Sequence, residues 1–176
     1  MTQLLILTGQ RLREVSDAQW PEVNLDKGVW TIPGGRAKNG VEHVVHLAPA
    51  ALEILRCLPR YQDVDFLFTT TLTSPVSGFS RARARLGTES GVTGWCFHDL
   101  RRTFATVASQ DLGLNPVVVD RILNHVSSTV RGVAAVYQRG QYLDQRKAAL
   151  EAWARYVVDL GRTDQTGNVE SLRRPA

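Results

Sequence analysis

The sequence is poor in the features that mark secreted and membrane-spanning proteins. It has two cysteines, Cys57 and Cys96, outside any zinc-ligand spacing, and we expect both to be buried thiols in a reducing compartment. No run approaches the roughly 18 apolar residues that a membrane span requires. The apolar segment 2–8 also lacks the basic region and the cleavage site of a signal peptide. The sequence therefore predicts a cytoplasmic protein that does not bind membranes.

Three patterns of catalytic residues are missing as well: clustered carboxylates, a glycine-rich Walker loop and a zinc motif. Metal-dependent nucleases and transposase-type integrases need clustered carboxylates to hold two Mg²⁺ ions, and the Walker loop cradles the phosphates of nucleotides. We therefore expect neither a metal nor a cofactor. Arginine, lysine and histidine would have to neutralise any phosphate that this protein handles.

What the sequence does contain is typical of one globular domain with a basic balance. Its 176 residues suffice for a sizeable core, and its 43% of hydrophobic and 22% of charged residues exclude a disordered chain. Lysine and arginine exceed aspartate and glutamate by 21 to 17, and the pI is about 9.4. This balance favours a polyanionic partner. Because the net charge is only +4, the placement of the arginines matters more than their number.

The hydrophobic pattern predicts a mainly α fold with a small antiparallel β-hairpin or three-stranded sheet, an α+β arrangement. Two β-rich runs, 28–33 and 43–47, flank a glycine-containing loop whose turn signal is Asn39-Gly40. The loop also carries Lys38. A lysine at a hairpin tip is normally only a solubilising residue.

Local signals predict several helices. Pro49 fits the first turn of one helix, and Asn115 followed by Pro116 fits the start of another. Gly161 would close the last helix. The predicted helices cover residues 2–8, 11–20, 48–58, a stretch from 97 onward, 116–123 and 148–160.

The last predicted helix is amphipathic and would be followed by a flexible tail. Leu150, Trp153, Val157 and Leu160 share one stripe of the helix. Residues 162–176 are polar and rich in helix breakers, so we expect them to be disordered.

The most informative stretch runs through residues 97–106. It places His98 and Arg101 three residues apart, so both side chains would leave one face of a helix near its start. Unpaired backbone N–H groups, an imidazole and a guanidinium in that position would bind a phosphate well. Taken alone, the stretch also fits a capping or core histidine and, with Arg102, a solvated helix face.

Other segments decide between these alternatives. They are Thr8-Gly9-Gln10-Arg11-Leu12-Arg13-Glu14-Val15, Lys38-Asn39-Gly40, Leu123-Asn124-His125 and Val136-Tyr137-Gln138-Arg139. Together with the stretch 97–106, and in this order, they resemble the catalytic domain of the tyrosine recombinases, the phage-type integrases, over nearly the whole chain. The run after Tyr137 is similar to that of integrases from phage satellites and genomic islands.

The resemblance implies a DNA breaking–rejoining catalytic core and a set of roles. Tyr137 would attack the scissile phosphate and form a 3′-phosphotyrosyl bond, which conserves the phosphodiester energy. Arg11 and Arg101 would hold the two non-bridging oxygens. Glu14 would hold Arg11 or its neighbours in place, although an Arg–Glu pair three residues apart is usually only a surface ion pair.

The remaining roles that the resemblance implies concern protons and hydrogen bonds. Lys38 would protonate the 5′-oxygen that leaves. His125 would add a further donor to the phosphate. His98 would accept the proton of the tyrosine or support the phosphate, which suits an imidazole that titrates near neutral pH.

The implied partner is double-stranded DNA at attachment sites, bound by a homotetramer that could be monomeric without DNA. Residues 1–161 would form the catalytic domain, and the separate N-terminal DNA-binding domain of the family would be absent. The side chains that would contact DNA are Arg81, Arg83, Arg85, Arg102 and Arg139. The stretch 79–86, which carries three of them, equally fits a solvated helix face.

The sequence departs from the family pattern at two positions and leaves three choices open. Arg13 stands where the family usually has glycine, and His46 where a proline is common. Tyr142 is an alternative to Tyr137 as nucleophile, although the similar subgroup uses the first tyrosine. Two other functions remain: a truncated remnant that binds DNA or an integrase without recombination, and a type IB topoisomerase-like activity.

Overall fold

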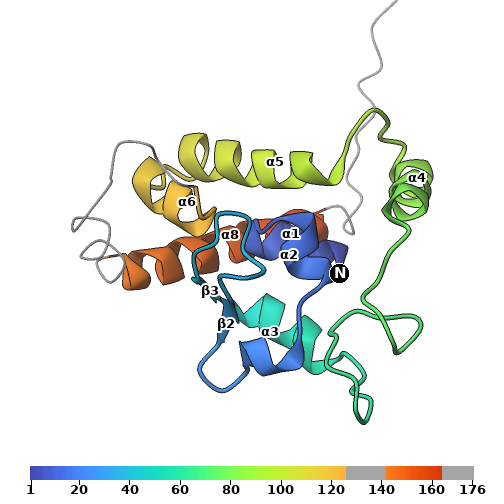
Figure 1. Cartoon of the computed structure of the whole chain (residues 1–176). Coiled ribbons are helices and arrows are strands. Elements are labelled where there is room, and N and C mark those ends of the chain that lie inside the picture. Colours follow the sequence, from blue (N-terminus) through green and yellow to red (C-terminus); the bar gives the residue numbers. More distant parts are fainter. Residues whose placement is uncertain (126–141, 164–176) are drawn as a thin grey trace, which may run out of the picture.

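The computed structural model describes residues 1–125 and 142–163. The chain folds as a mainly helical body with one three-stranded sheet, as the sequence predicts. Figure 1 shows α5 and α6 on one side of α1 and α8, with the strands and α3 on the other side. The elements are α1 Thr2–Thr8, α2 Leu12–Ser16, the 3₁₀ turn η1 Trp20–Glu22, β1 Val23–Asn24, β2 Val29–Ile32, β3 His43–His46, α3 Pro49–Arg56, α4 Phe79–Ser90, α5 Phe97–Gln110, α6 Pro116–Ile122 and α8 Leu143–Thr163.

Helix α1 lies at the centre of the core because its neighbours pack on it from several sides. It contacts α3, α5 and α8, and Leu4 and Leu5 are buried. The rings of Phe104 on α5 and Trp153 on α8 meet edge to face with centroids 5.1 Å apart. The indole N–H of Trp153 donates to the carbonyl of Ile6 at 2.8 Å. The core therefore fixes α1, and with it the residues that follow α1.

The sheet has the order β1-β2-β3, and both pairs of strands are antiparallel. Trp30 pairs with Val45 and Ile32 with His43, and all four side chains are buried because they share the inward face. The loop 33–42 joins β2 to β3. Strand pairing at residues 32 and 43 thus fixes both ends of the loop that carries Lys38.

Two helix starts agree with their sequence signals, whereas one helix ends earlier than predicted. Pro49 occupies the first turn of α3, and the side chain of Asn115 accepts the N–H of Val117 at 2.9 Å. The prediction of a helix from 11 to 20 was wrong in its second half, since α2 ends at Ser16. The chain instead pairs with residues 65–67, where the carbonyl of Ala18 accepts the N–H of Leu67 at 2.9 Å.

Both cysteines are exposed, which contradicts the prediction of buried thiols. Cys57 is the residue just after α3, and Cys96 the residue just before α5. Apolar neighbours in the sequence misled the prediction, because both cysteines lie at helix ends, outside the buried faces of α3 and α5.

Helix α8 is longer at both ends than the predicted helix 148–160. It begins at Leu143 and continues through Gly161, which does not end it. One glycine costs a helix about 1 kcal/mol relative to alanine, which the rest of a long helix can outweigh. The predicted stripe is buried at Leu150 and Trp153, but Leu160 is 51% exposed. The predicted tail lies outside the described residues from 164 onward.

Helix α4 lies at the side of the helical body, away from α6 (Figure 1). Its first residue anchors it, because the ring of Phe79 meets that of Phe97 edge-on at 6.2 Å and the guanidinium of Arg13 lies 5.3 Å from the Phe79 ring centre. Arg13, which stands at the usual glycine position, therefore reaches α4. Among the described residues, no helix is both long and apolar enough to cross a membrane.

Candidate active site

The candidate site lies at the C-terminal end of α6. A helix leaves its last carbonyl oxygens unpaired and carries partial negative charge there. Here three consecutive carbonyls, those of residues 122–124, accept side-chain donors from elsewhere in the chain. The bonds are Gln10 and His43 to Ile122 at 2.9 and 3.0 Å, Arg101 to Leu123, and Arg11 and Asn39 to Asn124 at 3.5 and 3.4 Å.

The turn between α1 and α2 places two of these donors. Gly9 ends α1 with φ +64°, and a side chain there would meet Phe104 at 2.9 Å. This left-handed turn directs the carbonyl of Gly9 to Arg101, which donates to it at 2.8 Å. The turn also leaves Gln10 buried and Arg11 at the start of α2. Glycine is required because the conformation and the close approach both disfavour a Cβ.

Arg101 projects from α5 into the body of the protein and is only 4% exposed. Its guanidinium donates to the carbonyls of Gly9 and Leu123. Burial, followed by the charge of Arg11, lowers the pKa of Arg101 to about 10, although Glu14 acts in the opposite direction. Arg101 is therefore a cation at neutral pH whose environment still favours a further negative charge.

Glu14 holds Arg11 in this site through both carboxylate oxygens. The Arg11 guanidinium donates to Glu14 Oε1 at 3.0 Å, and the Arg11 backbone N–H donates to Oε2 at 3.1 Å. The Glu14 side chain is 3% exposed and that of Arg11 is 21% exposed. The sequence spacing suggested a surface ion pair, but the carboxylate is buried and the pair is part of the site.

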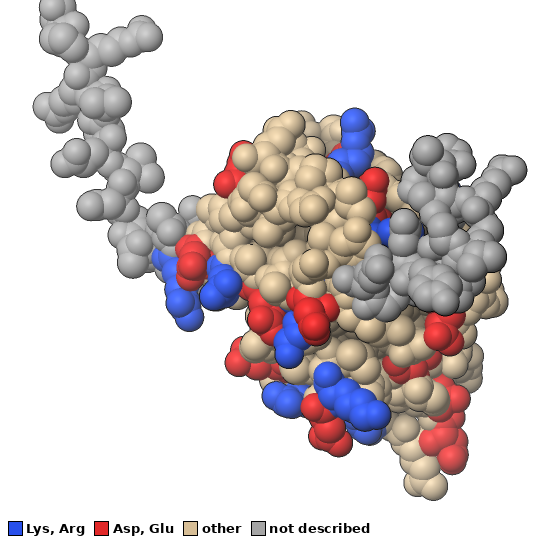
Figure 2. Space-filling model, turned by 90° about the vertical axis from the view of Figure 1, so that its left-hand side faces the viewer, with Lys and Arg blue, Asp and Glu red and all other residues tan. Residues whose placement is uncertain are grey.

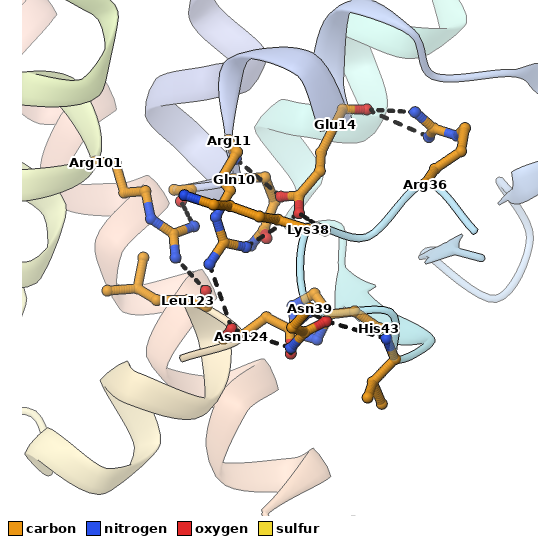
Figure 3. Close-up of polar contacts among 12 residues, drawn as sticks. Gln10, Arg11, Glu14, Arg36, Lys38, Asn39, His43, Arg101, Leu123 and Asn124 are labelled. Carbon is orange, nitrogen blue, oxygen red and sulfur yellow. Dashed lines mark hydrogen bonds and ion pairs between the residues drawn. The ribbon is translucent and has the colours of Figure 1, made fainter. Parts of the chain in front are cut away.

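The loop 33–42 lies against the same carboxylate. Arg36 forms an ion pair with Glu22, at 2.5 and 2.7 Å, and donates to the backbone carbonyl of Glu14 at 3.3 Å. The backbone N–H of Lys38 donates to Glu14 Oε1 at 3.4 Å. Figure 3 shows the Lys38 side chain extending from the loop across Arg11 toward Arg101. The structure thus brings three of the predicted catalytic residues together.

These cations can bind a phosphate because two guanidinium groups and an ammonium group lie close together, while Glu14 pairs directly with one of them, Arg11. Glu14 is the buried acid among Arg11, Lys38 and Arg101. Guanidinium forks match the geometry of phosphate oxygens, and a buried pair of them grips an anion more strongly than exposed lysines would. Within residues 1–125 and 142–163, no group of three or more histidines, cysteines or acids is placed to hold a metal.

Known proteins are similar to this chain in sequence and in fold. The sequence model of the phage integrase family matches residues 1–139. The chain belongs to the phage integrase family.

Two curated integrases illustrate how much of a complete family member the chain represents. Prophage integrase IntA of Escherichia coli K12 is 29% identical over 170 residues, which cover 96% of this chain and 39% of the relative. The integrase of Enterobacteria phage P4 is 31% identical over 181 residues, which cover 91% of this chain and 40% of the relative. The chain therefore spans about 40% of the length of the curated integrases that it matches.

Solved structures of integrases and recombinases share the fold. The integrase from mycobacterium phage Brujita has a TM-score of 0.60 at 22% identity, over 85% of this chain and 50% of that chain. The XerA recombinase has a TM-score of 0.58 at 22% identity, over 79% of this chain and 56% of that chain. A lambda integrase dimer bound to a COC′ core site has a TM-score of 0.55 at 22% identity, over 80% and 42%. The prediction of an integrase catalytic fold is confirmed.

The two histidines predicted for the site are both exposed. His98 is exposed in the first turn of α5, where the N–H of Cys96 donates to Asp99 at 2.8 Å. That hydrogen bond lowers the pKa of Asp99. His125 is exposed just beyond α6 and its ring bonds to Asp120 at 3.0 Å. In the part of the chain described, neither ring contacts the arginine pair.

Two predicted residues of this integrase domain, Tyr137 and Arg139, lie outside the described residues, so their roles remain predictions. Tyr142, the alternative nucleophile, is half-buried and packs against the core just before α8. That position agrees with a packing role for Tyr142.

The predicted DNA-contacting arginines are exposed on α4 and α5. Arg81, Arg83 and Arg85 project from α4, where Arg85 pairs with Glu89 at 2.7 Å, and Arg102 on α5 pairs with Asp99 at 3.5 Å. A different face of the integrase domain, at the left side of Figure 1, shows acidic and basic side chains intermixed over its described part (Figure 2). The structure therefore leaves α4 available for a polyanion, while its role in DNA binding remains a prediction.

Sequence reasoning missed several residues of the integrase site. His43, Gln10 and Arg36 bond to the end of α6 or to Glu14, although none was predicted as a site residue. His43 occupies an inward position of a strand, and that alternation was a usable signal. The bonding partners of Gln10 and Arg36 are separated by 112 and 22 positions, so local patterns could not reveal them.

Proposed function

We propose that the chain is the catalytic part of a site-specific DNA recombinase, which integrates or excises DNA by cutting and rejoining strands through Tyr137. The observation that carries the proposal is that the side chains of Arg11, Arg101 and Lys38 lie together at the end of α6, where the buried carboxylate of Glu14 holds Arg11. Membership of the phage integrase family supports the same reaction.

In the proposed cleavage step the phenolic oxygen of Tyr137 attacks the scissile phosphorus, and the bond from phosphorus to the 5′-oxygen breaks. Arg11 and Arg101 stabilise the charge on the non-bridging oxygens. Lys38 gives its proton to the 5′-oxygen as that oxygen leaves, and His98 accepts the proton of the tyrosine. Rejoining reverses these transfers with the 5′-hydroxyl of another strand, so no external energy source is needed.

The proposal includes the carbonyl bonds of Arg101 as a resting state. Before DNA binds, the carbonyls of Gly9 and Leu123 occupy donors of the guanidinium. These bonds fix the plane of the fork, so a phosphate would meet a pre-oriented group rather than a flexible side chain. His125 would turn from Asp120 to the phosphate in the same step.

The proposed partner is double-stranded DNA at attachment sites, acted on in the cytoplasm. Solved relatives include a Tn1549 transposon integrase in complex with circular intermediate DNA and an XerH recombinase bound to a difH substrate. We propose a homotetramer on DNA. The residues that would contact the DNA backbone outside the site are Arg81, Arg83, Arg85, Arg102 and Arg139.

A nicked duplex that traps the covalent intermediate tests the proposal. Cleavage beside the nick releases a short strand, so that rejoining fails and the protein stays attached to DNA. We expect an adduct on a denaturing gel in the presence of EDTA, lost in Tyr137→Phe and retained in the matched control Tyr142→Phe. Salt-sensitive DNA binding with no adduct would instead support a remnant that binds without recombination. Relaxation of supercoils without a paired site would support the topoisomerase-like activity.

A further inference from the structure

The loop 33–42 is fastened on both sides of Lys38. Before the lysine, Arg36 bonds to Glu22 and to the carbonyl of Glu14. At the lysine, the backbone N–H reaches Glu14 at 3.4 Å, which is long for a hydrogen bond. After the lysine, Asn39 reaches across to α6. The loop contains three glycines, so its conformation depends on these contacts.

Asn39 and Asn124 exchange hydrogen bonds through both amide groups. Asn39 Nδ2 donates to Asn124 Oδ1 at 2.8 Å and to the Asn124 carbonyl at 3.4 Å, while Asn124 Nδ2 donates to Asn39 Oδ1 at 3.3 Å. Asn39 Oδ1 also accepts the N–H of Val41 at 3.1 Å, within the loop. The two asparagines are 85 positions apart. Figure 3 shows them facing each other below Lys38 and Arg11.

The backbone of Asn124 adds a second reason for asparagine at this position. Its φ is +49°, a left-handed conformation that asparagine adopts more readily than most residues other than glycine. Asparagine can therefore follow the end of α6 and still present an amide to the loop. Glycine would permit the same backbone but would leave Asn39 without its partner amide.

We propose that Asn39 and Asn124 form a clamp that holds the Lys38 loop against the end of α6 when no DNA is bound. Both are positioning residues that act through their neighbours, Lys38 and His125. The clamp holds the loop that carries the proton donor next to the segment that carries the second histidine. Both side chains can then approach the same phosphate from fixed positions. This inference rests on the proposed function for its catalytic consequence, but the clamp itself is a property of the free protein.

Hydrogen exchange of the free protein tests the clamp without any need for activity. We expect amides of residues 36–41 to exchange about five- to tenfold faster in Asn39→Ala and in Asn124→Gly, because both variants lose the two hydrogen bonds between the side-chain amides. The double variant should be no faster than the faster single variant. Asn39→Asp is the sharper variant, since it keeps the acceptor for Val41 but cannot donate to Asn124.

Two controls separate loss of the clamp from general loosening. Glu42→Gln changes an exposed residue of the same loop and should leave exchange at 36–41 unchanged. Amides of residues 149–154, in the buried part of α8, report whether a variant is still folded. Unchanged exchange of the loop in Asn39→Asp and Asn124→Gly, or effects that add in the double variant, would overturn the clamp.

A substrate with a sulfur in place of the 5′-bridging oxygen tests the catalytic consequence. A thiolate leaves without a proton donor, so a defect in the position of Lys38 should disappear on this substrate. On the normal substrate, with oxygen at the 5′-bridging position, we expect the rate of adduct formation to fall about a hundredfold or more in Lys38→Ala. In Asn124→Gly the same rate should fall about tenfold. Both should come within a few fold of wild type with sulfur, whereas Arg101→Lys should stay slow on both substrates.

The outcomes distinguish the clamp from the proposed function. A defect in Asn124→Gly that persists with sulfur would show that Asn124 does not act through Lys38 and would overturn the positioning role. If wild type forms no adduct with either substrate, the proposed function fails, while the exchange result still decides whether the clamp exists.

Discussion

The guanidinium of Arg101 donates a hydrogen bond of 2.8 Å to the carbonyl oxygen of Gly9, which lies 92 positions earlier in the chain. This bond joins the start of α5 to the turn between α1 and α2. It also places Arg101 beside Arg11, which follows that glycine by two residues. A long-range contact of one side chain with one backbone oxygen thus sets the spacing of the two guanidinium groups that we propose to bind phosphate.

Replacement of Arg101 by lysine should abolish most activity without loss of charge. Lysine cannot bond two carbonyls and a phosphate with one fixed fork, and the loss of one or two charge-assisted bonds corresponds to about a hundredfold. The rate of adduct formation on the nicked duplex measures this. Arg162→Lys, at an exposed arginine near the end of α8 that pairs with Asp159, is the matched control and should stay within a few fold of wild type.

Gly9→Ala should destabilise the fold, because the new Cβ would lie 2.9 Å from Phe104, which is fully buried, and φ is +64°. Strain and overpacking together predict a loss of about 2–4 kcal/mol, measured as the free energy of unfolding in urea. Gly35→Ala, in a loop position with no atom within 4 Å of the added Cβ, should change stability by less than about 0.5 kcal/mol. Equal effects at the two glycines would contradict this account of the turn.

Glu14→Gln should lower stability by about 2 kcal/mol, because the amide offers one acceptor where the carboxylate serves three donors. Those donors are the Arg11 guanidinium, the Arg11 N–H and the Lys38 N–H. The midpoint of urea unfolding measures the loss. Glu89→Gln, which breaks the exposed pair with Arg85, should have little effect. A neutral outcome for Glu14→Gln would mean that the buried carboxylate does not hold the site together.

Stability should fall in acid partly through His43. Burial, followed by the charge of Arg146, lowers the pKa of His43 from 6.5 to about 4. The unfolded chain therefore binds the proton first, so the contribution of neutral His43 is complete above pH 6.5 and is lost as the pH falls toward 4. That shift corresponds to about 3 kcal/mol. Urea unfolding of wild type and His43→Gln at pH 7 and pH 4.5 should show a smaller acid loss in the variant.

Local sequence signals predicted the parts of the fold that local chemistry determines. Pro49 and Asn115 begin helices because each satisfies the first turn of its own helix. Cys57 and Gly161 were misread for the opposite reason. The exposure of a capping residue depends on the packing of the whole helix, and so does the continuation of a helix past one glycine. Neither can be predicted from the neighbouring residues in the sequence.

The candidate site likewise contains residues that the sequence predicts and contacts that it does not predict. Arg11, Lys38 and Arg101 were found through the resemblance, since their motifs are contiguous. The contacts that hold them could not be read from the sequence, because Asn39 meets Asn124 across 85 positions and Gln10 meets Ile122 across 112. Such contacts exist only once α1, α5, α6 and the loop between β2 and β3 have come together.

The bonds at the end of α6 also bear on how freely this sequence can change. Ile122 and Leu123 contribute backbone oxygens rather than side chains, and any amino acid carries the same oxygen. What these two positions contribute is therefore the course of the backbone and apolar packing, not a particular side-chain group. An exchange between aliphatic residues there would keep the same anchor, whereas an insertion of a single residue would shift the carbonyl oxygens away from their donors at once.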